Sequence, residues 1–277
     1  MGESLTRGIA MPALLYGTAW KKAQTAALVR RALELGFRGI DTACQPRHYE
    51  EAAVGEGVAA ALGAGLRRED LYLQSKFTPL AGQDPARLPY DSQAPLAEQI
   101  AQSFAASCRN LRTAYLDALV LHSPLATARE TLEAWRALES LAQAGGVRRL
   151  GISNCYRLGD LETLHRAAHI KPSIVQNRFY ADTGYDRSIR AFCRAQGLTY
   201  QSFWTLSANA GLLASATLGE LASRYGRTPA QILFRHLTQQ HIVPLTGTCS
   251  EAHMREDLAI FAFELSASEC AALDALC

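Results

Sequence analysis

The sequence predicts an α/β protein folded as a single (β/α)8 TIM barrel over residues 1–277. Short apolar runs alternate eight times with longer segments of helical periodicity. The length of 277 residues is also close to the roughly 250 residues typical of this barrel. A doubly wound sheet is the main alternative, but its first strand would usually precede a GxGxxG loop. Residues 16–20 instead read Tyr-Gly-Thr-Ala-Trp, so the barrel is favoured.

Eight short apolar runs are the predicted strands. In chain order they span residues 14–17, 37–41, 71–76, 117–122, 148–153, 173–177, 199–204 and 242–246. Helical periodicity predicts helices between and after them at 25–35, 50–62, 96–111, 130–144, 160–168, 185–195, 217–225 with 229–239, and 267–276. Four glycines stand where helices should end in a left-handed residue: Gly36, Gly63, Gly145 and Gly197.

Composition narrows the class of protein. Hydrophobic residues make up 48% of the chain, enough for a sizeable core. The net charge of +2 is made of interspersed signs, so we expect neither a nucleic acid nor an anionic membrane as partner. The seven cysteines include no CxxC pair, which favours a reduced, cytoplasmic protein over a disulfide framework. No HxH pair ends a strand, so we expect no metal, and a metal-dependent hydrolase is disfavoured.

Targeting signals are weak. No apolar run reaches 18 residues, and the N-terminus lacks an apolar segment, so neither a membrane span nor a signal peptide is expected. Residues 1–6 fit a loose N-myristoylation pattern, but no basic cluster follows them. We expect a monomer or a weak oligomer.

Polar side chains end three of the apolar runs. Asp41, Lys76 and His122 occupy these positions, and Tyr49 follows Asp41 in the connecting loop. The carboxyl ends of parallel strands form one edge of a barrel, so these groups should converge there. A phenol beside an ammonium, a carboxylate and an imidazole can donate a proton. The ordinary alternatives are a helix N-cap for Asp41, an exposed strand end for Lys76 and a core histidine for His122.

Several motifs in order along the chain resemble the aldo-keto reductase family. They comprise Gly17-Thr18 with Trp20, the segments 36–43 and 75–76, the segment 115–124 and the segments 151–154, 174–177 and 228–231. The resemblance implies a (β/α)8 barrel that binds a nicotinamide cofactor without a Rossmann fold. It also implies hydride transfer to an aldehyde or ketone, with a small-molecule carbonyl compound as partner. A cofactor-binding regulatory or partner-binding protein with weak catalysis remains the alternative.

The resemblance assigns catalytic roles to four residues. Tyr49 would donate a proton, but an unperturbed phenol has a pKa of about 10, which is high for this task. The ammonium of Lys76 would lower that pKa, and Asp41 would hold the ammonium in place. His122 would hydrogen-bond and orient the carbonyl oxygen.

The position of the proton donor leaves a choice between two neighbours. The family usually places its tyrosine five residues after the aspartate, whereas here position 46 is proline and the loop is two residues longer. Alignment from the downstream Glu51 would put His48 at the tyrosine position. We favour Tyr49, because an adjacent ammonium tunes a phenol well and a second imidazole poorly.

The resemblance also implies cofactor contacts. Ser153, Asn154 and Gln176 match the residues that hold the nicotinamide carboxamide, and Phe203 or Trp204 would stack on the ring. Thr18, Ala19 and Leu206 complete this part of the expected site.

The adenosine-phosphate segment departs most from the family. Many members carry Pro-Lys-Ser, then an arginine and Glu-Asn, but here Leu245 replaces the lysine and His253 the arginine. Thr246, Gly247 and Thr248 would still bind phosphate, and Asp257 ends the segment. Arg255 is the remaining strong cation, so it should carry any preference for a 2′-phosphate. NADPH is the family default, with NADH as the alternative.

The substrate walls are expected from Trp20, Phe77 and Tyr90. The loop 77–94 is long and directly follows Lys76, which is typical of a functional loop. Many family members continue beyond the last helix into a loop that closes the pocket, and this chain ends at Cys277. An open site with broad specificity is therefore expected.

Overall fold

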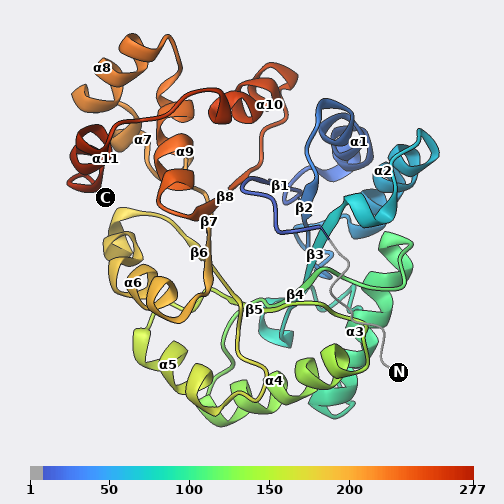
Figure 1. Ribbon diagram of the computed structural model, residues 1–277. Helices are drawn as coiled ribbons and strands as arrows, with labels where there is room; N and C mark the ends of the chain where they lie inside the picture. Colours follow the sequence, from blue (N-terminus) through green and yellow to red (C-terminus); the bar gives the residue numbers. More distant parts are fainter. Residues whose placement is uncertain (1–8) are drawn as a thin grey trace, which may run out of the picture.

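The computed structural model describes residues 9–277, which form one closed barrel of eight parallel strands. Figure 1 looks along the barrel, with the strands in the centre and the helices around them. The strands are β1 (Leu15–Gly17), β2 (Gly39–Asp41), β3 (Tyr72–Phe77), β4 (Ala118–Leu121), β5 (Leu150–Ser153), β6 (Ile174–Arg178), β7 (Thr199–Phe203) and β8 (Ile242–Thr246). Each strand pairs with the next, and β1 pairs with β8, so the predicted (β/α)8 barrel is confirmed. The N-myristoylation pattern lies outside the described residues.

The outer helices agree with most of the predicted ranges. They are α1 (Thr25–Leu35), α2 (Glu51–Gly63), α3 (Leu96–Leu111), α4 (Ala128–Gln143), α5 (Leu158–Ala167), α6 (Arg187–Gln196), α8 (Ala216–Tyr225), α9 (Pro229–Gln239) and α11 (Ala267–Asp274). Several starts are fixed locally: Thr127, Thr228 and Ser266 each form a capping box with the residue three positions on.

Two further helices were not predicted. The first, α7 (Ala210–Leu213), is a single turn. The second, α10 (Glu251–Leu258), is capped by the side chain of Ser250 and buries only Met254 and Asp257. Because a helix with so few buried residues has little apolar periodicity, the hydrophobic pattern did not reveal it.

One of the four glycine predictions is wrong. Gly36, Gly145 and Gly197 have the positive φ angles expected at helix ends. Gly63 instead lies inside α2, and the chain turns two residues later at Gly65, which has φ 108°. Only a residue without Cβ adopts such angles without strain, so the left-handed turn after α2 falls on Gly65 and not on Gly63.

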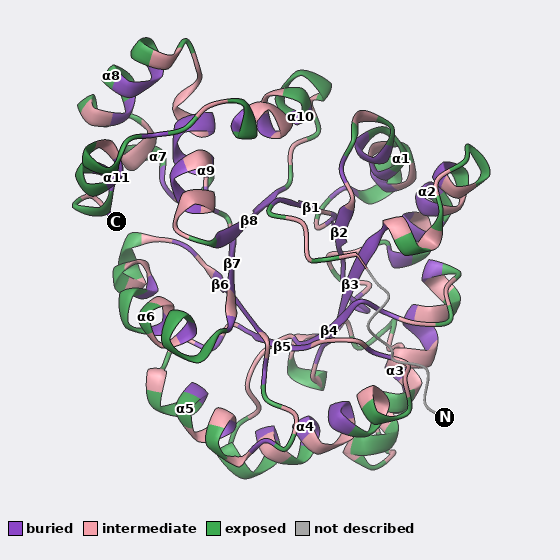
Figure 2. Ribbon diagram, viewed as in Figure 1, coloured by how far each residue is buried: buried purple, intermediate pink, exposed green. Residues whose placement is uncertain are grey.

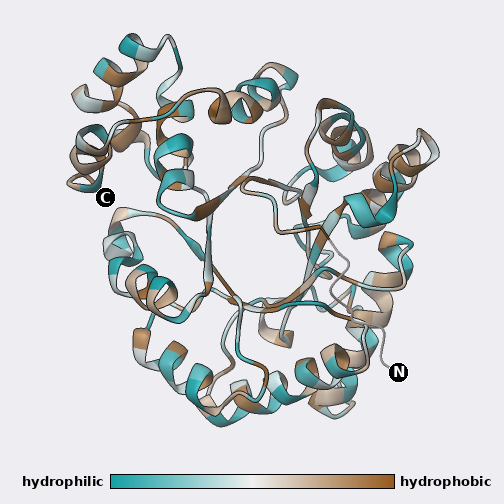
Figure 3. Cartoon of the chain, viewed as in Figure 1, coloured by the Kyte–Doolittle hydropathy of each residue, from teal (hydrophilic) through white to brown (hydrophobic). Residues whose placement is uncertain are grey.

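The barrel wall separates two kinds of surroundings. Figure 2 shows buried strands inside a ring of helices whose outer faces are exposed, and Figure 3 shows the corresponding hydropathy. Side chains alternate between the barrel interior and the helix layer, because successive residues of a strand point to opposite faces. On β3, Lys76 faces the interior, while Ser75 donates to the carboxylate of Glu51 on α2.

The start of α2 is anchored to the barrel by Glu51. Its buried carboxylate also accepts from Ser107 (2.9 Å) and Asn110 (3.0 Å) on α3. Close packing of the two helices requires Gly55, since a Cβ there would overlap the Asn110 carbonyl. These contacts hold the segment that carries Tyr49 against the rim of the barrel.

Two kinds of feature are absent from residues 9–277. No helix there is long and apolar enough to cross a membrane. Nor does that part of the chain contain a group of three or more His, Cys, Asp or Glu side chains placed to hold a metal ion.

Candidate active site

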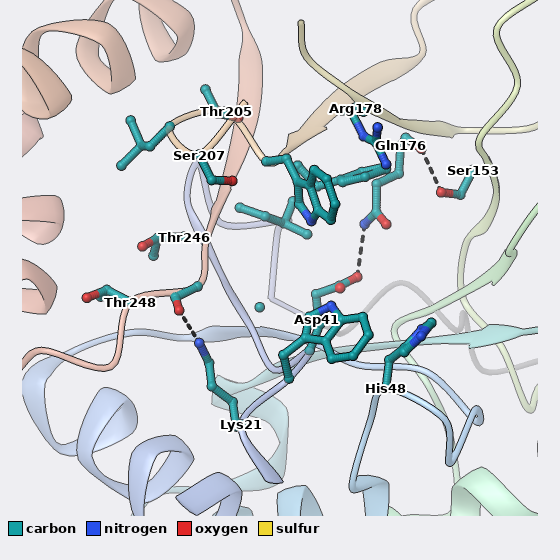
Figure 4. A pocket seen from close by; sticks show the side chains of 18 of the residues that line it. Lys21, Asp41, His48, Ser153, Gln176, Arg178, Thr205, Ser207, Thr246 and Thr248 are labelled. Atoms are coloured by element: carbon teal, nitrogen blue, oxygen red, sulfur yellow. Dashed lines mark hydrogen bonds between the residues drawn. The ribbon is translucent and has the colours of Figure 1, made fainter. Parts of the chain in front are cut away.

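A cavity of about 920 Å³ opens at the carboxyl ends of the strands, where (β/α)8 barrels place their active sites (Figure 4). Its volume lies within the range of small-molecule and cofactor sites. The predicted site residues on its wall are Ala19, Trp20, Asp41, Tyr49, His122, Ser153, Asn154, Gln176, Phe203, Trp204, Leu206, Thr246, Gly247, Thr248, His253 and Asp257.

Lys76 and Asp41 form a buried ion pair at the base of this cavity. Nζ of Lys76 lies 2.6 Å from Oδ2 of Asp41 and donates to the carbonyl of Thr42 at 2.9 Å. Their side chains are 1% and 3% exposed. Burial disfavours the charged ammonium, but Asp41 and Tyr49 outweigh this effect and raise the pKa of Lys76 above its ordinary value. Lys76 is therefore held as a cation.

A layer of glutamines supports the carboxylate. Oδ1 of Asp41 accepts from the amides of Gln74 (2.7 Å) and Gln176 (2.9 Å), and both amides also donate to Gln201. Sequence reasoning missed Gln74 and Gln201. The period-two alternation of β3 and β7 would have placed both on the inner face, since Gln74 precedes Lys76 by two residues.

Tyr49 lies beside Lys76, and His48 does not. The ammonium of Lys76 is 5.2 Å from the centre of the Tyr49 ring, and that ring meets His122 edge-on at a centroid distance of 6.1 Å. His48 instead stacks on Trp20 at 4.0 Å. The two candidates for proton donor therefore occupy different surroundings.

The pKa of Tyr49 differs in direction from the expectation. Burial raises it above 10, and the charge and hydrogen bond of Lys76 lower it by less, while Asp41 adds to the rise. Lys76 has the expected effect, but removal of the phenol from water is the larger one. Tyr49 is accordingly a protonated phenol in this structure.

His122 is oriented by Thr78. The imidazole Nδ1 lies 2.6 Å from the Thr78 hydroxyl, and the His122 backbone carbonyl accepts from Asn154 at 2.8 Å. Burial, followed by the charge of Lys76, holds the pKa of His122 well below its usual range, so the ring is neutral. Sequence reasoning missed Thr78, although it stands two residues beyond Lys76 on the same face of the chain.

Hydrogen bonds connect Ser153 at the end of β5, the following Asn154, and Gln176 on β6. Ser153 donates to the backbone carbonyl of Gln176 (2.7 Å), and Asn154 donates to Ser153 (3.3 Å). Asn154 also accepts from the Tyr156 hydroxyl (3.2 Å). Asn154 has φ 53°, and Trp20 and Trp204 on the same cavity have φ 64° and 55°. Left-handed backbone is rare for tryptophan, and such strain concentrates at functional sites.

The model of the Aldo/keto reductase family matches residues 8–277. The chain belongs to the aldo/keto reductase family. It is therefore an oxidoreductase of that family.

Relatives with known names support this assignment. The aldo/keto reductase is 33% identical over 249 residues to the uncharacterised oxidoreductase YtbE of Bacillus subtilis (strain 168), covering 90% of this chain and 82% of the relative. It is 29% identical over 248 residues to a glyoxal reductase of the same organism, with the same two shares of coverage. A solved aldo/keto reductase from Brucella melitensis is 27% identical, with a TM-score of 0.80 over 96% of this chain and 95% of that one.

Thr246 and Thr248, from the segment expected to bind the adenosine phosphates, lie at the other end of the cavity from Arg178 and Ser153 (Figure 4). Thr246 donates to the buried carboxylate of Asp257 at 2.6 Å, and burial raises the pKa of Asp257 to about 6. His253, Glu256 and Asp257 line the cavity, at positions i, i+3 and i+4 of α10. That spacing places them on one face of the helix.

Arg255 is not at the cavity. It projects from another face of α10, where it bonds Glu251 at 2.7 Å with 62% of its side chain exposed. The helix phase thus places Arg255 away from the cavity wall, where the prediction of a 2′-phosphate contact had expected it. Lys21, which was not predicted, lines the cavity and donates to the backbone carbonyl of Gly247. Lysines number only four in the chain, and this scarcity was the available signal for Lys21.

Two of the three predicted substrate walls are wrong. Trp20 is 56% exposed at the cavity, but Phe77 and Tyr90 are buried and pack on each other at 5.5 Å. Phe77 follows Lys76 by one residue, so it points to the helix layer. The loop 77–94 contributes Thr78 and Gly82 to the wall instead.

Two further predicted site residues lie off the wall. Thr18 is buried and donates to the Asp41 carbonyl at 2.9 Å, and Lys76 lies beneath the cavity surface.

Proposed function

We propose that this aldo/keto reductase reduces aldehydes or ketones to alcohols with NADPH or NADH, using Tyr49 as the proton donor. The observation that carries the proposal is the buried Lys76–Asp41 pair beside Tyr49, with a neutral His122 across from it. When bound, the nicotinamide supplies a hydride to the carbonyl carbon.

The lining fits such a cofactor by the chemistry of its donors. Ser153, Asn154 and Gln176 offer amide and hydroxyl groups for a carboxamide, and Phe203 offers a ring at the adjoining wall. At the other end, Thr246, Thr248 and the cation of Lys21 suit a diphosphate.

Each catalytic group has a distinct task. The Tyr49 hydroxyl donates its proton to the carbonyl oxygen, and Lys76 stabilises the phenolate that remains. Asp41 keeps Lys76 charged. His122 orients the carbonyl, because its neutral ring has a single N–H to offer.

The Thr78 contact decides which nitrogen of His122 carries that hydrogen. Among residues 9–277, the Thr78 hydroxyl has no acceptor besides Nδ1 of His122. If Thr78 donates there, the proton of the imidazole sits on Nε2, which is then the donor toward the carbonyl oxygen.

We propose modest discrimination between the two cofactors. Leu245, Thr246 and Thr248 offer no cation for a 2′-phosphate, and Lys21 already donates to the Gly247 carbonyl. The carboxylates of Glu256 and Asp257 lie on the same wall. A cytoplasmic monomer or weak oligomer is the proposed setting, consistent with the seven free cysteine thiols.

The test combines binding and turnover. Quenching of tryptophan fluorescence by NADPH and NADH measures the two Kd values, and NAD(P)H oxidation is then followed with benzaldehyde derivatives and with glyoxal. Glyoxal is included because a relative is named a glyoxal reductase. Tyr49→Phe should lower kcat by roughly 10²–10⁴-fold with cofactor Kd within a few-fold, since general acid catalysis contributes that much.

His48→Phe is the matched control, and it should cost much less. A severe loss in His48→Phe together with a mild one in Tyr49→Phe would assign the proton donor to His48. Tight cofactor binding without turnover of any aldehyde would instead indicate a regulatory protein.

A further inference from the structure

Arg178 is a cationic side chain in the cavity wall that the proposed reaction does not use. It is the last residue of β6, two positions beyond Gln176, and residues two apart on a strand share a face. Figure 4 accordingly shows Arg178 beside Gln176 and Ser153, on the side of the cavity away from Thr246 and Thr248.

Two aromatic rings hold the guanidinium of Arg178 in place. Its central carbon lies 4.0 Å from the Trp204 ring and 5.1 Å from the Tyr180 ring. Stacking of this kind fixes the plane of a guanidinium and leaves its N–H groups at the edge free to bond. Trp204 is also 47% exposed with φ 55°, so the ring is held at the mouth of the cavity by strained backbone.

The donors of Arg178 have no acceptor within the described chain. No carboxylate of residues 9–277 lies within 4.0 Å of this guanidinium, and Nε is buried without a hydrogen bond. Arg190 and Arg227 also have an unpartnered, buried Nε, but neither lines the cavity. An arginine whose planar fork faces a cavity without a counter-ion matches a carboxylate or a phosphate, which accept two parallel hydrogen bonds.

Arg178 is also connected to the reacting groups. Its backbone N–H donates to the Tyr156 hydroxyl (3.1 Å), which donates to Asn154, which in turn bonds the backbone of His122. This chain of contacts places Arg178 on the His122 side of the cavity. The carboxylates of the far wall belong to α10, where an anionic substrate would be repelled.

We propose that Arg178 is the anion-binding group of the substrate subsite, and that the preferred carbonyl substrates carry a carboxylate. This inference rests on the proposed function. The same guanidinium chemistry would also suit the diphosphate of the cofactor, and the experiment separates these two sources of the anion.

The experiment compares three variants on matched substrates. Arg178→Met removes the charge but keeps an apolar side chain against Trp204, and Arg178→Lys keeps the charge without the fork. Arg190→Met is the control, because Arg190 stacks on Phe179 at 5.4 Å with an unpartnered Nε away from the cavity. The substrates are the 2-, 3- and 4-carboxybenzaldehydes and their methyl esters, and cofactor Kd is measured for each variant.

For the native enzyme, kcat/KM should favour one acid isomer over its ester, and Arg178→Met should remove that preference. The expected decrease in kcat/KM is about tenfold to a hundredfold for the acid and none for the ester. A decrease of this size corresponds to the loss of one charge-assisted hydrogen bond. Arg178→Lys should retain part of the preference for the acid, and Arg190→Met should leave the acid-to-ester ratio of kcat/KM unchanged. An acid-to-ester ratio unchanged in Arg178→Met overturns the proposal. So does an equal loss on acid and ester with a raised cofactor Kd, which would assign the anion to the cofactor.

A second readout does not depend on turnover. Benzoate should quench the fluorescence of the native protein saturated with NADPH, with Trp204 as the reporter. The Kd of benzoate obtained from this quenching should rise at least tenfold in Arg178→Met. This result would support the subsite even if no aldehyde were reduced and the proposed function failed. Equal benzoate affinity in both proteins would overturn the subsite while leaving carbonyl reduction intact.

Discussion

Replacement of Asp41 by asparagine should destabilise the protein through Lys76. In the native protein the 2.6 Å ion pair is almost fully buried, and Asp41 keeps the ammonium charged. An asparagine retains a carbonyl oxygen for the Gln74 and Gln176 amides, but it presents an amide donor to the ammonium. Lys76 would then be buried without a counter-charge, so its amine would be neutral in the folded variant.

The cost follows from the proton that must be released. A lysine in water has a pKa of about 10.4, whereas a buried lysine without a partner titrates near 5–6. The lysine of the variant must therefore release its proton on folding at pH 7. Because pH 7 is about 3.4 units below the pKa of the unfolded state, this release costs about 4.6 kcal/mol. This agrees with the ~3–5 kcal/mol lost when one partner of a buried pair is removed. The expected decrease in the free energy of unfolding of Asp41→Asn is therefore about 4 kcal/mol at pH 7.

The pH dependence identifies the mechanism. In Asp41→Asn the folded pKa of Lys76 falls below the unfolded value, so the unfolded state binds one more proton between those two pKa values. The free energy of unfolding therefore rises with pH, by about 1.4 kcal/mol per unit. In the native protein the folded pKa of Lys76 is raised, so no such slope arises between pH 7 and pH 9. The difference in free energy of unfolding between the native protein and Asp41→Asn should therefore decrease by about 2.7 kcal/mol from pH 7 to pH 9.

Urea unfolding at pH 7, 8 and 9 measures these differences, with Asp117→Asn as the matched control. Asp117 is a fully buried barrel carboxylate that pairs with Arg68 and Arg148, both at 2.8 Å. Arginine stays protonated throughout this range, so the control should lose stability without the pH slope. The reasoning would be refuted if Asp41→Asn lowered the free energy of unfolding by less than about 1 kcal/mol. It would also be refuted if the decrease in Asp41→Asn were as independent of pH as the decrease in Asp117→Asn.

Substitutions at three other positions test the remaining features of the site. Thr78→Val should lower kcat/KM about fivefold to tenfold, because His122 loses an orienting bond worth ~1 kcal/mol, whereas Thr78→Ser should retain activity; equal activities would contradict this role. Asp257→Asn should raise the free energy of unfolding at pH 7 by up to about 3 kcal/mol. The buried carboxyl has its pKa raised to about 6, so its ionisation destabilises the fold as pH rises through 6 and not below pH 4. A gain of the same size at pH 4 and pH 7 would point to the Thr246 contact instead. Arg255→Ala should leave the Kd of NADPH and of NADH within about twofold by fluorescence titration, because its side chain is 62% exposed; a selective loss of NADPH affinity would restore its phosphate role.

Much of the proposed catalytic set could be predicted from the sequence, because strand ends converge in a parallel barrel. Asp41, Lys76 and His122 each end an apolar run, and a closed barrel brings all such ends to one rim. Local periodicity therefore implied the gathering of residues far apart in sequence. The same reasoning failed for Phe77, where the alternation of β3 was not followed one residue past Lys76.

The sequence by itself determined the barrel, the order of its strands and the order of its larger helices, since these depend on local periodicity. The structure alone decided how neighbouring side chains divide their tasks. His48 and Tyr49 are adjacent in the chain, yet one stacks on Trp20 and the other lies beside Lys76. The helix phase that turns Arg255 outward is likewise not visible in a polar segment with little apolar pattern. Such choices depend on burial and on contacts between distant segments, and a local pattern carries no information about either.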